Sequence, residues 1–119
     1  MINGTHVVIY TSDAEADRAF FRDVLGLPSV DAGHGWLIFQ APPSEIAFHP
    51  TQSVHSHELM LMCDDLEATV AELTAKGVEF TRPVQELNWG LLTGFRLPGG
   101  GDLALYEPRH PRAASAGQA

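Results

Sequence analysis

The sequence is poor in several features, and each shortage excludes a class of structure. It contains one cysteine, Cys63, which excludes an intrachain disulfide and any metal site built from several cysteines. A lone cysteine suits a reducing compartment, so we expect a cytoplasmic protein. No apolar run approaches the ~20 residues of a membrane span, and the N-terminus lacks a signal-peptide pattern. We therefore expect no membrane partner.

Positive charge is also scarce. Seven Lys and Arg residues stand against 15 Asp and Glu residues, which gives a net charge of −8. An acidic surface repels the phosphates of nucleic acids and of anionic lipids, so neither is an expected partner. The 119 residues, 45% of them hydrophobic, are enough for one domain with its own core. We expect that domain over residues 1–109 and a flexible tail over residues 110–119, which lack apolar periodicity.

What is present is an order of elements that occurs twice. Residues 12–26 open with a serine followed three residues later by a glutamate, carry an apolar stripe at helical spacing and end near a glycine. Residues 64–77 repeat this pattern with an aspartate in place of the serine. Asp13 and Asp65, which are 65 − 13 = 52 residues apart, occupy matching points in the two halves. Each predicted helix follows an apolar strand and precedes short β-like runs broken by Gly and Pro.

This order, β-α-β-β-β used twice, predicts an α+β fold with one module over about residues 5–50 and a second over about residues 56–108. Period-two alternation along the strands separates an apolar face, expected beneath the helices, from a mixed face. Aromatic, thioether and ionisable side chains together suit a ligand pocket, although a dimer interface or a solvated face remains an alternative. The candidate ligand-binding residues on the mixed face are His6, Tyr10, Trp36, Gln40, His49, Glu58, Met60, Met62, Arg96 and Tyr106.

Two further features have plain structural interpretations. Cys63 falls on the apolar face, where a thiol usually behaves as a small, inert hydrophobic group. The run "PGGGD" precedes a strand and has no helix behind it, so it predicts a hairpin turn and not a phosphate-binding loop.

Three segments resemble one known superfamily. "AFFRDVLGLPSV" resembles the signature helix and following strand of the vicinal oxygen chelate superfamily, which includes glyoxalases, bleomycin resistance proteins and extradiol dioxygenases. "DDLEATVAELTAKGVEF" resembles the matching part of its second module, and "FRLPGGGDLALYEP" resembles its closing hairpin. The resemblance covers roughly residues 5–109. It implies two βαβββ modules whose mixed sheets curl into a half-barrel around a central cavity.

The resemblance also implies where a divalent metal would bind. Metalloenzymes of the superfamily place ligands at positions that correspond here to His6, Ala47, Glu58 and Ala104. Imidazole and carboxylate suit a divalent ion, whereas alanine donates nothing, and alternation points Glu107 to the opposite face. His6, His49 and Glu58 form an alternative set, although His49 lies about 7 Å along the strand from the usual ligand position. We therefore expect no obligatory cofactor, with a divalent metal as the alternative.

The function expected from the resemblance is small-molecule binding of the glyoxalase and bleomycin-resistance type. Sequestration of an antibiotic or of a hydrophobic metabolite is the use we expect. Aromatic rings and thioethers of the mixed face would hold the ligand by stacking and dispersion. Arg96 would pair with an anionic group of the ligand or, equally, with Glu58 or Asp102.

Two other functions remain alternatives. One is a metal-dependent lyase, isomerase or dioxygenase that uses His6, Glu58 and His49, in which the ion polarises two substrate oxygens. The other is an interaction module whose mixed face is filled by a partner chain. The resemblance implies a homodimer, and the sequence leaves open whether the modules pair within one chain or by exchange between two.

Overall fold

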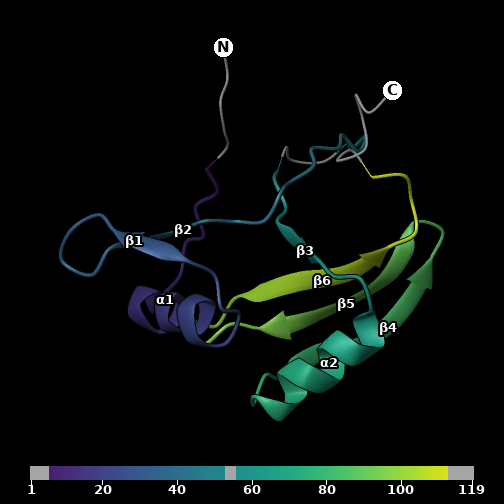
Figure 1. The fold of residues 1–119 in the computed structure, drawn as a ribbon. Coiled ribbons are helices and arrows are strands. Elements are labelled where there is room, and N and C mark those ends of the chain that lie inside the picture. The colour runs from purple at the N-terminus through teal and green to yellow at the C-terminus, as the bar shows by residue number, and fades with distance from the viewer. Residues whose placement is uncertain (1–5, 53–55, 113–119) are drawn as a thin grey trace.

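The computed structural model describes residues 6–52 and 56–112. Within them, the helices and strands follow in the order α1 (Ala14–Asp23), β1 (Ser29–Asp31), β2 (Leu37–Phe39), β3 (Met60–Met62), α2 (Leu66–Ala75), β4 (Phe80–Leu87), β5 (Gly90–Arg96) and β6 (Asp102–Pro108) (Figure 1). These elements confirm the predicted α+β class. Of the two helices in the described ranges, neither is long and apolar enough to cross a membrane.

Both helices begin in the same way. The side chain of Asp13 accepts a hydrogen bond from the Ala16 N–H of α1 at 3.0 Å, and Asp65 accepts one from the Ala68 N–H of α2 at 3.1 Å. These bonds satisfy N–H groups that have no partner within the helix. Each capping aspartate lies one residue after the helix start that the sequence predicted, which was residue 12 for α1 and residue 64 for α2. The repeat is therefore structural, because matching aspartates cap the N-terminus of the helix in both halves.

The second module forms a four-stranded sheet in the order β3-β6-β5-β4. β3 runs parallel to β6, whereas β5 pairs antiparallel with both β6 and β4. The two helices lie on the same side of this sheet, and the sheet curls without closing into a barrel (Figure 1). Helices and sheet share one apolar core, which consists of Phe20, Leu66, Leu73, Val78, Phe95, Leu97, Leu103 and Leu105. The second module thus has the complete predicted βαβββ order.

The first module differs from the prediction in its outer strands. β1 and β2 pair antiparallel as a two-stranded sheet, but the strands predicted at "HVVIYT" and "EIAFHP" are wrong, since both segments lie outside any ladder. Alternation makes a strand only where a neighbour supplies hydrogen bonds, and none lies beside these segments in the described chain. Their apolar side chains are consequently exposed, Val7 by 60% and Phe48 by 94%. Thr5 and residues 113–119 of the predicted tail lie outside the described residues.

Polar contacts join the two modules, and two of them meet at Gly99. Asp17 of α1 is 7% exposed, and its Oδ1 accepts a hydrogen bond of 2.7 Å from the Gly99 N–H in the turn between β5 and β6. The Ser12 hydroxyl donates to the Gly99 carbonyl at 2.8 Å. The predicted hairpin turn at "PGGGD" is confirmed, and it is fastened to the first helix from the other half of the chain.

Candidate ligand-binding face

The side of the four-stranded sheet that faces away from the helices carries the candidate site. Leu91, Phe95, Leu103 and Leu105 take the helix side, so their neighbours along β5 and β6 point to the other side. We call this other side the helix-free face. Strand register places two rows of residues on it from β4 to β3, namely Arg82, Gly94, Ala104 and Met60, and then Gln85, Leu92, Tyr106 and Met62.

A bulge in β4 directs Arg82 onto this face. Phe80 pairs with Phe95 and Arg82 pairs with Gly94, so β4 has one residue more than β5 between the two pairs. The Phe80 ring therefore packs against Phe95 in the core, with ring centroids 5.8 Å apart, while Arg82 emerges on the opposite side. A second register shift follows Arg82, where Pro83 has no N–H to donate. Bulges of this kind reorient side chains.

Tyr106 is the buried aromatic group of the helix-free face. Its ring meets the Trp89 ring edge-on with centroids 5.2 Å apart, and its hydroxyl lies 3.1 Å from His110 Nε2. Burial raises the pKa of the Tyr106 hydroxyl, the charge of Glu45 adds to this effect and the charge of Arg112 opposes it. The phenol therefore stays protonated and able to donate a hydrogen bond at neutral pH.

The structure brings three of the ten sequence candidates together, since Met60, Met62 and Tyr106 share the helix-free face. Arg96 ends β5 and lies 3.9 Å from Asp102, which makes it an exposed ion pair. Trp36 lies in the β1–β2 hairpin beneath the guanidinium of Arg18, 4.6 Å from the ring centroid. The remaining candidates are exposed on segments outside the strands, and they are His6, Tyr10, Gln40, His49 and Glu58.

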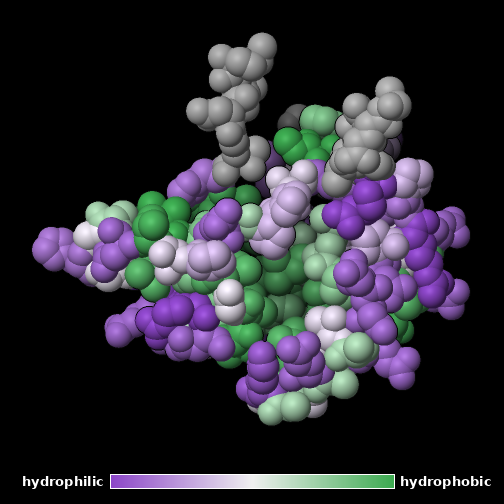
Figure 2. Space-filling model, viewed as in Figure 1, coloured by the Kyte–Doolittle hydropathy of each residue, from purple (hydrophilic) through white to green (hydrophobic). Residues whose placement is uncertain are grey.

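Two hollows lie on the helix side of the sheet. One of ≈ 300 Å³ is lined by residues of α1 and of the end of β5, including Phe20, Leu97 and Arg96. Another of ≈ 330 Å³ lies between α2 and the strands, against Leu66 and Leu91. Apolar side chains gather in a recess near the middle of the view in Figure 2. Of the ten sequence candidates, Arg96 lines one of these two hollows and the others line neither.

The described donor groups do not fit the metal site that the resemblance implies. Ala104 lies in register between Met60 and Gly94 and has no donor atom. His49 is exposed, and its Nδ1 lies 2.9 Å from the carbonyl of the adjacent proline. Across residues 6–52 and 56–112, no group of three or more His, Cys, Asp or Glu side chains is placed to hold an ion. We therefore derive no chemical step through a metal.

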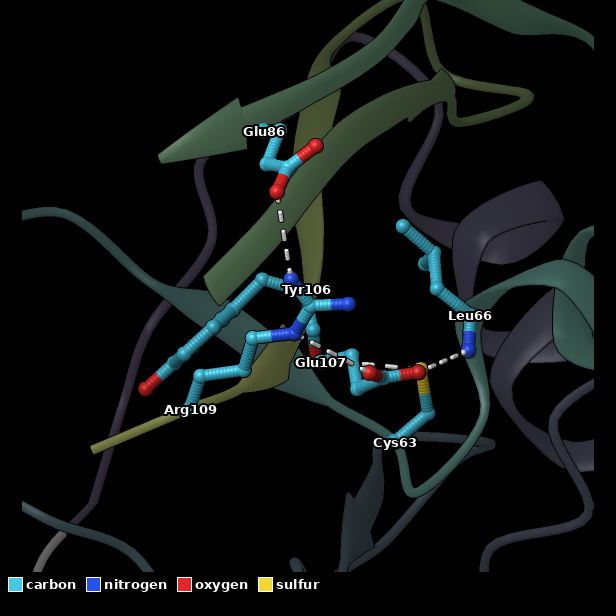
Figure 3. Close-up of polar contacts among 6 residues, drawn as sticks. All are labelled: Cys63, Leu66, Glu86, Tyr106, Glu107 and Arg109. Atoms are coloured by element: carbon cyan, nitrogen blue, oxygen red, sulfur yellow. Dashed lines mark hydrogen bonds and ion pairs between the residues drawn. The ribbon is translucent and has the colours of Figure 1, made fainter. Parts of the chain in front are cut away.

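Glu107, which lies three positions after Ala104 in the sequence, contacts the second helix instead. Its Oε1 accepts a hydrogen bond of 2.9 Å from the Leu66 N–H at the start of α2, and its Oε2 lies 3.8 Å from Arg109 Nε (Figure 3). Arg109 also reaches Glu86 at 3.5 Å. The predicted orientation of Glu107 away from the mixed face is confirmed, because this carboxylate is held at the N-terminus of a helix on the other side.

Cys63 lies at the edge of the same contact group. Its Sγ is 3.7 Å from the Tyr106 carbonyl, and its side chain packs against the core (Figure 3). Burial raises the pKa of the Cys63 thiol, and nearby carboxylates, Glu107 first among them, raise it further. The thiol is therefore protonated at neutral pH and is a poor nucleophile, as its position in the sequence predicted.

Sequence reasoning missed Arg82. Alternation from Phe80, which belongs to the core, places Arg82 on the helix side as well, and only the bulge between them reverses this. The signal that would have found it is Pro83, since a proline within a strand marks an edge or a bulge.

Comparison with known proteins agrees with this fold. The family model described as Glyoxalase/Bleomycin resistance protein/Dioxygenase superfamily matches residues 5–110. None of the curated proteins searched matches the chain. Several solved structures resemble it over most of their length.

TnmS3, an antibiotic binding protein from Streptomyces sp. CB03234, is 25% identical, with a TM-score of 0.60 over 91% of this chain and 99% of that one. A lactoylglutathione lyase from Agrobacterium tumefaciens is 18% identical, with a TM-score of 0.65 over 88% of this chain and 92% of that one. A protein of the same superfamily from Sphaerobacter thermophilus DSM 20745 is 24% identical, with a TM-score of 0.63 over 89% and 98%. The last two likenesses concern the fold alone.

Proposed function

Because the chain belongs to the glyoxalase/bleomycin resistance protein/dioxygenase superfamily, we propose that it is a small-molecule-binding protein that sequesters an antibiotic or a hydrophobic metabolite without an obligatory metal. The ligand would lie on the helix-free face, where the thioethers of Met60 and Met62 border the ring of Tyr106. Such groups hold flat or apolar molecules by dispersion and by sulfur–aromatic contact.

One observation carries the proposal. β3 pairs with β6 so that Met60 stands beside Ala104 and Met62 beside Tyr106. In metalloenzymes of the superfamily, the position that corresponds to Ala104 carries a carboxylate. In this chain the alanine methyl group extends an apolar surface instead. The likeness to an antibiotic binding protein over 91% of the chain supports the same choice.

A homodimer in a reducing cytoplasm is part of the proposal. The segments 6–10 and 45–49 carry exposed apolar side chains and belong to no ladder in the described chain. The equivalent strands of the second module are β3 and β6, which pair with each other. A second copy would supply the missing hydrogen bonds and cover the exposed side chains, since unpaired strand segments readily add to a sheet edge.

The test is binding by EDTA-treated protein to a panel of purified antibiotics with fused aromatic rings. A ligand present at about 100 times its Kd should raise the free energy of unfolding by about 2.7 kcal/mol, which a thermal shift detects. Titration calorimetry should then give one site per chain, and Met60→Ala should weaken binding. If no compound in the panel binds, the proposal fails. If binding needs Mn²⁺, Ni²⁺ or Zn²⁺ added after EDTA treatment, the metal-dependent alternative is favoured.

A further inference from the structure

We propose that Arg82 recognises an oxyanion group on the ligand. The ligand class is then an aromatic or apolar small molecule that carries a carboxylate, phosphate or sulfonate. This inference rests on the proposed function, because it assigns the polar contact of the same face. The structural basis is the row Arg82, Gly94, Ala104 and Met60, in which the Arg82 guanidinium lies over Gly94.

The guanidinium of Arg82 is uncommitted. Among the arginines that the structure describes, Arg22, Arg96, Arg109 and Arg112 each pair with a carboxylate, and Arg18 lies over Trp36. Arg82 is exposed and makes neither kind of contact within the described residues. Its backbone carbonyl accepts a hydrogen bond of 2.8 Å from the Thr93 hydroxyl, which fixes the main chain and leaves the side-chain donors free.

Gly94 leaves space for the side chain of Arg82. A Cβ on Gly94 would lie 2.7 Å from Arg82 Nε and 3.0 Å from Nη2, so any other residue there would displace the guanidinium. The glycine is not required by its backbone angles, because its φ lies outside the left-handed region. A Cβ would also lie 3.1 Å from the Leu103 carbonyl, so the glycine at this position of β5 leaves space both for the Arg82 guanidinium and for the neighbouring strand. The guanidinium lies over Gly94, and its planar fork of N–H donors suits an oxyanion.

The rest of the row defines the other end of the ligand. Between Arg82 and Met60 lie only Gly94 and Ala104, so the floor of this row is small and apolar. Three strand spacings of about 4.8 Å separate the two ends, which is roughly the length of a fused-ring molecule. Met62 and Tyr106 border the floor in the neighbouring row. A molecule with an oxyanion at one end and an apolar body matches this arrangement.

The net negative charge of the chain means that binding of an anionic ligand depends on a specific positive group. With a net charge of −8, the protein repels anions from most directions, so an anionic ligand needs a specific positive group. Arg96 and Arg112 also lie near this face, but Arg96 is 3.9 Å from Asp102 and Arg112 is 3.1 Å from Glu45. Arg82 is therefore the group that we assign to the oxyanion.

Two fluorescent probes with one skeleton test the assignment. Anilinonaphthalene sulfonate carries a sulfonate, and phenylnaphthylamine is the same aromatic body without it. The wild-type protein should bind both at one site per chain. Arg82→Gln should weaken binding of the sulfonate probe about fivefold, as the loss of an exposed charge pair implies, and leave the neutral probe unchanged. Arg82→Lys should give an intermediate loss, and Gly94→Ala should match Arg82→Gln although it keeps the charge.

Arg22→Gln is the matched control, because it removes an arginine on α1 that is already paired with Asp23. It should change neither affinity, and thermal melts should show that the Arg82 variants remain folded. Equal binding of the sulfonate probe by wild type and Arg82→Gln overturns the inference, as does a loss seen with Arg96→Gln instead. In both cases retained binding of the neutral probe leaves the proposed function standing. If neither probe binds the wild type, the proposed function fails and the inference fails with it.

Discussion

Asp17 and Gly99 are 82 positions apart in the sequence, yet the Oδ1 of Asp17 accepts a 2.7 Å hydrogen bond from the Gly99 N–H. A Cβ on Gly99 would lie 2.8 Å from Asp17 Oδ2 and would also meet the Thr11 hydroxyl. Gly99→Ala should therefore lower the free energy of unfolding by about 1–3 kcal/mol, as overpacking does. Urea denaturation measures this, with Gly101→Ala as the control because its Cβ meets nothing within 4 Å. Equal stability of the two variants would show that Asp17 and Gly99 are not tightly packed against each other.

Glu107 should stabilise α2 from a neighbouring strand. Its carboxylate, 22% exposed, accepts from the Leu66 N–H at the positive end of the helix dipole. Glu107→Gln should cost about 0.5–1 kcal/mol, measured by urea denaturation at low salt. Glu86→Gln removes a carboxylate that lies 3.5 Å from Arg109 and is 78% exposed, so it should have little effect. If the two variants lose the same stability, the helix contact contributes nothing.

The Cys63 thiol should make stability depend on alkaline pH. Its pKa is raised in the folded chain, first by burial, above the ordinary value of 9.0. The unfolded chain therefore releases this proton at a lower pH than the folded chain. The stabilising effect is complete below pH 9.0 and is lost as the pH rises through the folded-state pKa. Denaturant unfolding between neutral and alkaline pH should show the decline, and Cys63→Ala should make it shallower; an unchanged profile in that variant would contradict the prediction.

The exposed segments of the first module should hold two chains together. Phe48 is 94% exposed in one chain, and burying a side chain of this size contributes about 1.5–3 kcal/mol. Phe48→Ser should therefore weaken the dimer at least about tenfold in sedimentation equilibrium. Val84→Ser is the control, since Val84 is also half-exposed but lies on β4, away from these segments. A wild-type chain that sediments as a monomer at all concentrations would end the proposal of a homodimer.

The sequence predicts what is decided locally. The aspartates Asp13 and Asp65 lie where the helices begin, because an N-cap needs only its own helix turn. Strands β4, β5 and β6 follow from alternation and from turns at Gly and Pro, and they pair with the strands next to them in the chain. The hairpin between β5 and β6 was predictable for the same reason.

What the sequence fails to predict depends on distant partners. "HVVIYT" is rich in strand-forming residues, but neither composition nor alternation says which chain or segment lies beside it. The ten candidates were chosen by the same alternation. It holds for Met60, Met62 and Tyr106 on paired strands, and it has no structural counterpart for residues such as His6, which lies on an unpaired segment. Arg82 was missed because one inserted residue reverses the alternation without leaving a hydrophobic signal.

The bulge in β4 makes the side on which Arg82 emerges depend on strand pairing more than on residue identity. Without the bulge, simple alternation of the same residues would turn the guanidinium toward the Phe80–Phe95 contact, where a charge has no counterion. Deleting Thr81 would remove the extra residue and let Phe80 still pair with Phe95 and Arg82 with Gly94, so the guanidinium would stay on the helix-free face. Relatives with a strand of the same length but no bulge would consequently be expected to turn the residue at this position toward the core, even where their amino acids align well.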